Sequence, residues 1–497
     1  MIRRRNLATT SLLALALAGC VNLAPDHARP GLTTEPAYDP AYQPDGSVVA
    51  SRLPWRDFFV DPRLEGLIAT ALLNNRNLLA ATARIEQARA QYRIQDAARL
   101  PTVGVNGSAA RSRTPLGTIP GFGTAPVTDQ PGDGGEVVAD PPSSITLNRF
   151  DVNVGVTSFE LDFWGRVANL SEAARATYLS TEAAQRAFYL SLIGDVAETY
   201  YQLVETQEQI ALARQTADSR REGLRIAELR LNSGVESALP TRQAEALLTQ
   251  AEQQVQAQEL TEAQLTNQLA VLVGGRVPGI LPAGLTLNEQ ENGLEIDAGL
   301  PSDLLLARPD IIQAEEELRA ARANIGAARA AFFPSISLTG SFGFSSVELD
   351  NLFTGSNQAW SFGPSINLPI FDWGAREGQL DFARAREVEE VAQYDLAVQN
   401  AFREVSDALA GRRWLAEQVR TLERGVVAQE EIANIARLRY REGVADFLEV
   451  LDAERSLFTA QQALLTTRRA YRANAVVLYV ALGGGMLAPD AVPATER

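Results

Sequence analysis

Few of the side chains that enzymes use for chemistry occur in this sequence, which has one cysteine, one histidine and two methionines among 497 residues. A single cysteine excludes a disulfide within the chain, and with a single histidine it excludes a metal site built from these two residue types. His27 lies in a proline-rich N-terminal stretch, which argues against a histidine-dependent triad. No glycine-rich phosphate-binding loop is present. We therefore predict no enzymatic activity, no metal site and no bound cofactor.

Lysine is absent altogether, so all 45 basic residues are arginines, and the net charge is −16. Proteins bind nucleic acid through clustered cations, and an acidic chain without a basic patch is a poor candidate for this role. We predict no nucleic-acid partner. Beyond residue 20 the sequence has no apolar run of about 18 residues, which excludes a transmembrane helix from the mature chain.

The N-terminus has the parts of a secretory signal peptide. Residues 3–5 are arginines, and residues 11–19 form an apolar segment too short to span a membrane. The segment Leu17–Cys20 (LAGC) resembles the lipobox of bacterial lipoproteins, in which the cysteine is lipidated and becomes the mature N-terminus. The alternative is an ordinary signal peptide and a chance cysteine, but the only cysteine lies at the required place. Val21 follows instead of aspartate, which by the sorting rule for lipoproteins directs the protein outward.

Two halves of the chain share one plan. The motif Arg-x-x-x-Gly-Val occurs with its glycine at Gly234 and again at Gly443, 209 positions later. The same spacing relates several further pairs, namely Trp164 to Trp373, Leu269 to Leu478 and Gly274 to Gly483. Upstream, Pro101 matches Pro334 at a spacing of 233, because the first half carries a longer Gly/Pro-rich loop at residues 114–142. A constant spacing over these motifs indicates an internal repeat.

Each half is predicted to contain a helix, two strands, a long helix, a break and another helix. No proline occurs between residues 165 and 231 or between residues 374 and 441. Helices of roughly 65 residues would be about 100 Å long, which favours coiled-coil packing over a globular core. Gly234 and Gly443 mark the breaks at which the chain reverses. We therefore predict one long helical hairpin in each half.

Apolar and small polar residues alternate in the segments between these helices. The alternating apolar residues are Val103, Val105, Phe150, Val152, Val154, Val156, Ile336, Leu338, Phe342, Phe344, Phe362, Ile366 and Leu368. Such strands suit a membrane-spanning sheet, although a half-buried strand of a soluble sheet shows the same alternation. Four strands cannot close a barrel in lipid, so a barrel would have to be shared between chains. Two copies leave almost no lumen, whereas three copies give twelve strands and a pore.

A set of ordered motifs resembles the TolC family of outer-membrane efflux ducts, in its lipoprotein branch (the OprM/NodT type). These motifs are Cys20, Pro25-Asp26, Arg29-Pro30, Trp55-Arg-Asp-Phe58-Phe59, Asp61-Pro62-x-Leu64, Asn74-Asn75, Leu306-Ala-Arg308-Pro309-Asp310-Ile311, Ala314-Glu315, Ile325-Gly326, Phe332-Phe333-Pro334-Ser335, Arg439-Tyr440-Arg441-x-Gly443-Val444, Leu451-Asp452-Ala453 and Gly483-Gly484-Gly485. The resemblance implies an α+β membrane protein. Its barrel would be trimeric, with four transmembrane β-strands per chain, and would continue into a long α-helical coiled-coil barrel.

The domain limits follow from the repeat and the resemblance. Residues 1–19 would be the signal peptide and 20–60 the lipid-anchored N-terminal segment. The first structural repeat would cover 61–275 and the second 309–484. Residues 276–308 would form a linker within an equatorial belt, and 485–497 a C-terminal tail.

The resemblance also implies a function. The chain would be the outer-membrane channel subunit of a tripartite efflux system, passively conducting drugs or other toxic solutes. Its partners would be two further copies of itself, outer-membrane lipid, a periplasmic adaptor and an inner-membrane pump of the resistance-nodulation-division class. A duct for protein secretion is the alternative, and a structural coiled-coil envelope protein is a second one.

The periplasmic end of the duct would be closed by polar contacts at the hairpin turns. By position, Tyr440, Arg441 and Asp452 match the pattern of this branch. Another branch uses an arginine two residues after the glycine and an acid six after it, and here these positions hold Ala445 and Glu449. The family pattern therefore implies a gate of Tyr440, Arg441, Glu449 and Asp452. An ordinary solvated helix pair between Arg441 and Asp452 is the alternative.

Overall fold

The computed structural model describes residues 21–31, 38, 48–115, 144–277, 279, 281–290, 296–298 and 304–488. Within these ranges the chain is mainly helical and contains one four-stranded sheet. Among the described helices, none combines the length and the apolar character needed to cross a membrane. The predicted signal peptide, Cys20, most of the 114–142 loop and residues 489–497 of the predicted tail lie outside the described ranges.

The elements follow one another as the internal repeat predicts. Before the first repeat lie η1 (Ala50–Arg52) and α2 (Trp55–Phe58), and the repeat begins with α3 (Pro62–Asn74). The first repeat continues with α4 (Arg76–Ala97), β1 (Val103–Pro115), β2 (Ser144–Leu161), α5 (Arg166–Asn232) and α6 (Ala238–Leu272). After α7 (Leu304–Ala307), the second repeat contains α8 (Pro309–Ala330), β3 (Ser335–Ser346), η4 (Gly355–Asn357), β4 (Gln358–Asn367), α9 (Ala375–Arg441) and α10 (Phe447–Ala481).

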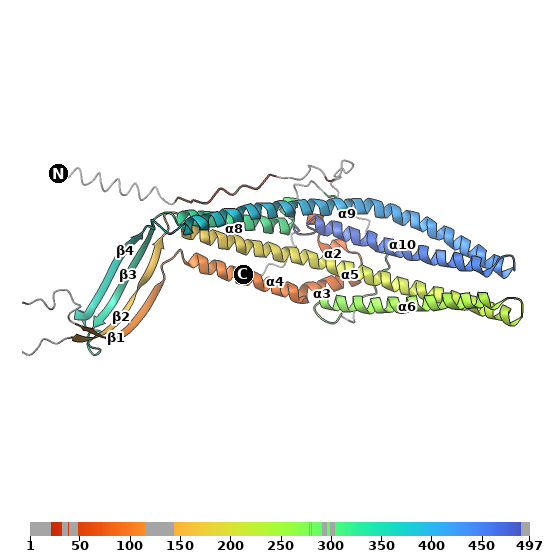
Figure 1. The fold of residues 1–497 in the computed structure, drawn as a ribbon, viewed down its shortest axis with the longest axis horizontal. Coiled ribbons are helices and arrows are strands. Elements are labelled where there is room, and N and C mark those ends of the chain that lie inside the picture. Colours follow the sequence, from red (N-terminus) through yellow and green to blue (C-terminus); the bar gives the residue numbers. More distant parts are fainter. Residues whose placement is uncertain are drawn as a thin grey trace, which may run out of the picture. The chain divides into compact units, whose positions relative to one another are not determined.

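The helices of the two repeats are equal in length. Both α5 and α9 have 67 residues, and both α6 and α10 have 35. The shorter helices α4 and α8 have 22 residues each. Each long helix turns back into the shorter helix that follows it (Figure 1), as expected from proline-free stretches interrupted by glycine.

The sheet belongs to a compact unit that includes residues 90–175 and 320–386. Its strand order is β1-β2-β3-β4, and all neighbouring strands are antiparallel. One row of paired residues runs across it from Val105 through Val154 and Phe342 to Trp360. This row is apolar, and Phe342 and Trp360 are exposed at the surface of the chain. The described part of the sheet therefore presents an uncovered apolar face.

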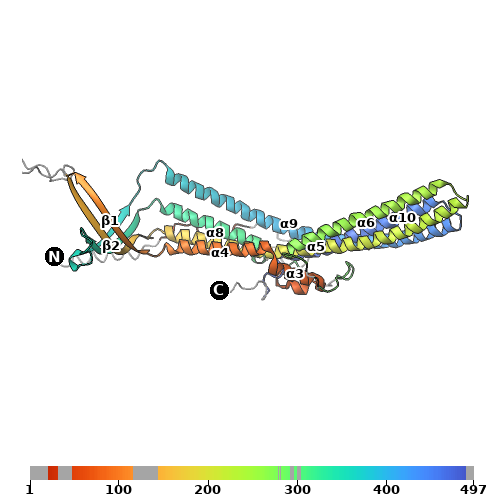
Figure 2. The ribbon, with the colours of Figure 1, turned by 90° about the horizontal axis from the view of Figure 1, so that it is seen from below.

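A second compact unit contains most of the buried side chains. It includes the described residues within 28–89, 176–319 and 387–497. Asp61 accepts a hydrogen bond from the Arg63 backbone at the start of α3 (2.8 Å), which caps this helix. The buried Tyr200 hydroxyl of α5 donates to the same carboxylate at 2.7 Å. Figure 2 shows α5, α6 and α10 packed together in this unit.

The Arg308-Pro309-Asp310 motif connects α8, α9 and α10 in the second unit. The Arg308 guanidinium donates two hydrogen bonds to Asp310, at 3.0 and 2.6 Å. It also donates to the carbonyl of Ala481 at the end of α10 (2.9 Å) and pairs with Glu404 of α9 (2.8 Å). Because an arginine fork matches a carboxylate in two places, the motif fixes direction as well as distance. This explains its place in the sequence pattern structurally.

Candidate functional site

The two hairpin turns have the same construction. In the first, the Gly234 amide donates to the Leu231 carbonyl and the Val235 amide to the Arg230 carbonyl, both at 3.0 Å. In the second, Gly443 donates to Tyr440 (3.0 Å) and Val444 to Arg439 (2.9 Å). This is a Schellman motif, which needs a residue with positive φ after the helix. The φ angles of Gly234 and Gly443 are 69° and 74°, which glycine adopts without steric cost.

Buried side chains, many of them alanine, pack the two hairpins together near these turns. They are here called the hairpin-tip cluster and are Ala227, Ala244, Ala433, Ala436, Tyr440, Phe447, Val450 and Ala453. Tyr440 is the largest polar residue among them and is only 5% exposed. Its ring lies 5.1 Å from that of Phe447, measured between centroids. The cluster therefore holds the ends of the hairpins together around one tyrosine.

Tyr440 also connects the second hairpin to polar groups of the first. The Arg230 guanidinium lies 4.2 Å from the centre of its ring and donates to the Tyr440 backbone carbonyl at 3.0 Å. The Tyr440 hydroxyl donates to Glu236 at 3.2 Å. Burial raises the pKa of Tyr440, and the nearby Glu236 charge acts in the same direction. The phenol therefore stays protonated and continues to donate this hydrogen bond at neutral pH.

The other three predicted gate residues lie at the surface. Arg441 is exposed, and its closest acidic partner is the neighbouring Glu442 at 3.7 Å. Asp452 pairs with Arg455 one turn along α10 at 2.5 Å, and Glu449 pairs with Arg439 at 2.6 Å. Among the described residues no ion pair joins Arg441 to Asp452, and each pairs instead with a residue near it in the sequence, as ordinary solvated side chains do. Exposed ion pairs are worth only about 0–1 kcal/mol each, so these contacts can exchange partners.

The structure therefore separates the four predicted residues into one internal contact and three surface groups. Arg230 and Glu236 were not predicted as site residues, although they contact Tyr440 directly. The only sequence signal for Arg230 was its place in the repeated Arg-x-x-x-Gly-Val motif. Cys20 lies outside the described residues. In the ranges that the structure covers, no cluster of three or more His, Cys, Asp or Glu side chains is placed to hold a metal ion.

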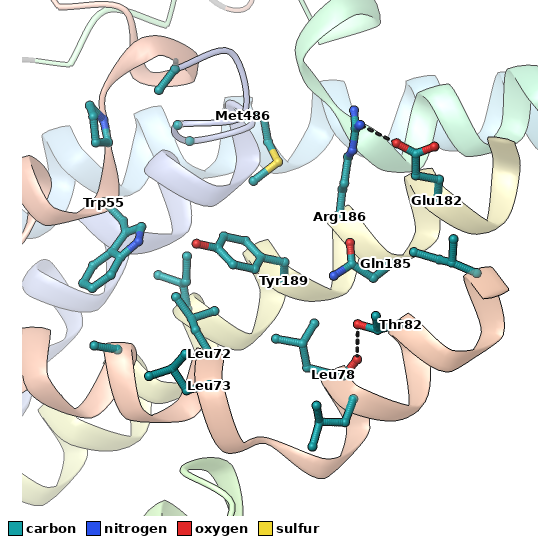
Figure 3. Close-up of a pocket in the computed structure, with 18 of the residues that line it drawn as sticks. Trp55, Leu72, Leu73, Leu78, Thr82, Glu182, Gln185, Arg186, Tyr189 and Met486 are labelled. Atoms are coloured by element: carbon teal, nitrogen blue, oxygen red, sulfur yellow. Dashed lines mark hydrogen bonds and ion pairs between the residues drawn. The ribbon is translucent and has the colours of Figure 1, made fainter. Parts of the chain in front are cut away.

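A pocket of about 880 Å³ lies elsewhere in the second unit, against α3, α4, α5 and the segment after α10. Figure 3 shows Leu72, Leu73 and Leu78 on one side of it and Tyr189 of α5 on another. The Glu182–Arg186 ion pair (2.5 Å) is the labelled charged contact, and its two charges compensate each other. None of the residues predicted from the sequence as site residues lines this pocket.

Comparisons with known proteins agree over nearly the whole chain. A family model described as "Outer membrane efflux protein" matches residues 67–275 and 300–484. The "Cation efflux system protein CusC" of Escherichia coli O6:H1 is 39% identical over 95% of this chain and 97% of the relative. The "Toluene efflux pump outer membrane protein TtgC" of Pseudomonas putida is 40% identical over 96% of each chain.

Solved structures give the same picture. A crystal structure of CusC superposes with a TM-score of 0.80 at 37% identity, covering 93% of this chain and 100% of the other. The open state of the Neisseria gonorrhoeae MtrE outer membrane channel also gives a TM-score of 0.80 at 37% identity, covering 94% of this chain and 98% of the other.

Proposed function

The chain belongs to the outer membrane efflux protein family. We propose an assembly, a gate and a membrane anchor for the channel that it forms. The chain is the outer-membrane channel component of a tripartite efflux system. Its activity is transport and not catalysis. The proposed assembly, gate and anchor of this channel depend on different parts of the chain.

The main support for an assembly of several copies is that the sheet is open at both edges. Strands β1 and β4 are its two edges, and neither has a second neighbour among the described residues. An unpaired edge cannot face lipid, because each free backbone group there would cost several kcal/mol. Three copies placed edge to edge would close twelve strands around a water-filled lumen. We therefore propose a homotrimer with one shared barrel.

The two faces of the sheet support this arrangement. Val105, Trp360 and Phe362 are exposed on one face, which suits contact with lipid. The opposite face carries small hydroxyl groups, including the Ser337–Ser365 pair at 2.7 Å and the Ser341–Ser361 pair at 2.8 Å. A lumen lined with such groups would pass solutes of many kinds. We propose that the pump, and not this channel, chooses the cargo.

The gate is proposed at the turns of the hairpins. Tyr440 fixes one hairpin to the other within a chain, which leaves Arg441, Glu449 and Asp452 on the outside. In a trimer, Arg441 and Asp452 would meet polar groups of the neighbouring copies and hold the periplasmic end narrow. Contacts of this exposed kind are weak, so a docking partner can replace them. The proposed partners are a periplasmic adaptor and a pump of the resistance-nodulation-division class.

Lipid on Cys20 is the proposed anchor, and it is the only covalent group that the proposal requires. One acyl signal alone binds a membrane weakly, whereas an anchor combined with a membrane-spanning sheet holds firmly. The names of the relatives mention cations and toluene. For this chain we propose drugs or other toxic solutes delivered by the pump.

Ion conductance in a planar bilayer tests the gate. We expect small conductance from the wild-type protein and a several-fold rise for Arg441→Ala/Asp452→Ala, because the weak contacts that narrow the pore are lost. A matched control is Arg403→Ala/Asp407→Ala, which removes an exposed pair (3.2 Å) within α9 away from the turn and should leave conductance unchanged. Equal conductance in all three proteins would contradict the gate role of Arg441 and Asp452 but not the channel function. No conductance from correctly assembled oligomers would contradict the channel itself.

A further inference from the structure

The two repeats place the same tryptophan in different surroundings. In the first repeat, the Trp164 indole Nε1 donates to the Pro334 carbonyl at 2.9 Å. Its ring stacks on Phe333, with centroids 4.6 Å apart and planes 24° apart. The counterpart 209 positions later, Trp373, is 89% exposed. Its ring contact is with Phe371, two residues away (4.7 Å). In the described chain, no hydrogen bond involves the Trp373 indole.

The partner of Trp373 can be deduced from the repeat. Trp164 contacts Phe333 and Pro334, which precede β3 of the second repeat. The residues 233 positions earlier are Leu100 and Pro101, which precede β1. Both are exposed in this chain, so they lack their tryptophan just as Trp373 lacks its partner. The chain therefore contains both sides of a second contact of this kind, Trp373 on one side and Leu100 with Pro101 on the other, but does not bring them together.

A single chain cannot join them, because β1 and β4 are the opposite edges of the sheet. We propose that Trp373 of one copy stacks on Leu100 of a second copy and donates its indole N–H to the carbonyl of Pro101 there. This interface rests on the proposed function, since it joins β4 of one copy to β1 of the next. It repeats between chains the contact that already joins β2 to β3 within one.

The same argument predicts the register of the new strand pair. Within the chain, Leu161 of β2 lies opposite Ile336 of β3, and Phe159 lies opposite Leu338. Moving each residue by its repeat spacing places Ile370 opposite Val103, and Leu368 opposite Val105. All four of these side chains are exposed and apolar in the isolated chain. The predicted pairing would therefore make these apolar side chains cross-strand neighbours and continue the apolar face from one copy to the next.

Disulfide cross-linking tests the register. Residues directly opposite in an antiparallel pair have Cα atoms about 4.5–5.5 Å apart, within the range of a disulfide. We expect Val103→Cys/Ile370→Cys, oxidised in isolated membranes, to give covalent dimers and trimers on a non-reducing denaturing gel. Gly104→Cys/Ile370→Cys is the matched control, because a shift of one residue places the new thiol on the other face. Each single variant shows whether Cys20 takes part.

The indole contact has its own test. Trp373→Phe keeps an aromatic ring but removes the donor, and we expect its oligomers to dissociate at a lower temperature than those of the wild type. Trp360→Phe is the control, since Trp360 is also exposed, on the apolar face, but has no counterpart contact in the repeat. If oligomers form and conduct ions but Val103 and Ile370 do not cross-link, the proposed interface is wrong and the channel stands. If no oligomers form, the trimer proposed above fails as well.

Discussion

Arg220 of α5 is a buried cation without a bound carboxylate among the described residues. It is 5% exposed and lies against α6 and α10. One terminal nitrogen donates to the Leu247 carbonyl at 2.8 Å, and the guanidinium lies 5.6 Å from the centre of the Phe458 ring. Its Nε has no hydrogen-bond acceptor. Burial lowers the pKa of Arg220, so the charged form is destabilised where it lies.

We expect Arg220→Met to stabilise the protein by about 1 kcal/mol, because methionine fills a similar space without the cost of burying an unpaired charge. The Leu247 carbonyl lies within α6, where the helix supplies another donor. Thermal unfolding followed by circular dichroism in detergent measures the effect. Arg225→Met serves as the control, since Arg225 is exposed and paired with Glu222 on the same helix. A lower melting temperature for Arg220→Met than for Arg225→Met would show that the charge is needed.

At the residue scale, the sequence predicted one member of the contact that joins the hairpins. Tyr440 stands beside a turn glycine in a family pattern, which made it a candidate. Arg230 and Glu236 come from the other repeat, about two hundred residues away, and nothing local marks them as its partners. A repeated arginine supports the fold and a functional contact equally well. The contact could be identified only once the two hairpins were placed side by side.

At the scale of the elements, glycines end four helices with the same geometry but in different surroundings. Gly274 and Gly483 follow α6 and α10 with φ angles of 78° and 73°. A Cβ atom added to Gly274 would lie 2.1 Å from the Asn74 carbonyl oxygen, and one added to Gly483 would lie 2.6 Å from that of Ala307. At the turn glycines Gly234 and Gly443, an added Cβ would meet open space.

Alanine substitutions should therefore separate backbone strain from collision. We expect Gly443→Ala to cost about 1–2 kcal/mol, which is the penalty of a left-handed conformation for an L-residue. Gly483→Ala should cost more, because the new methyl group also overlaps the backbone carbonyl of Ala307. Thermal unfolding of the two variants, measured side by side, compares these costs. Equal losses of stability would mean that the Ala307 segment moves aside freely.

The lengths of the elements were predictable to different degrees. The long helices followed from proline-free stretches, and the structure begins and ends them within a residue or two of the glycines that mark them. The strands extend beyond the alternating segments. For example, β2 covers residues 144–161, although only residues 150–157 alternate clearly, and β1 continues from Asn106 to Pro115. Pairing with a neighbouring strand keeps these residues extended, and no property of a single strand records that.

For the whole molecule, the absence of lysine gives a direct test of the anchor. The mature chain would have one primary amine, at the N-terminus on Cys20, and acylation would remove it. We expect an amine-reactive dye to leave the wild-type protein unlabelled. Cys20→Ser, which would keep its unprocessed N-terminus, should be labelled once. Arg225→Lys is the positive control, because it adds one exposed amine without touching the N-terminus.

Gel fluorescence and intact mass report the outcome. Wild-type protein labelled as strongly as Cys20→Ser, and without the mass of a lipid, would contradict lipidation. A labelled wild-type protein that carries the lipid mass would show an anchor with a free amine. These readings do not depend on transport, so they test the anchor separately from the channel.

The number of copies is the property of the whole molecule that the sequence left most open. The repeat and the strand pattern predicted four strands per chain, but they could not distinguish a membrane sheet from a soluble one. Exposed Val103, Trp360 and Ile370 became informative only when the structure placed Val103 and Trp360 on the two edge strands and Ile370 just after the second of them. The match to the outer membrane efflux protein family then favoured a membrane sheet over a soluble one.

Pairing between β2 and β3 has a consequence for the order of folding. These strands are neighbours in the sheet, yet all of α5, α6, α7 and α8 lies between Leu161 and Ser335 in the chain. Local contacts form fast and distant pairings slowly, so the helical hairpins should fold before the sheet. The membrane-inserting surface would then appear only after both halves have been synthesised and exported. A chain still in transit through the periplasm would carry β1–β2 and β3–β4 as separate hairpins, and it would present the complete apolar face only at the end of this transit.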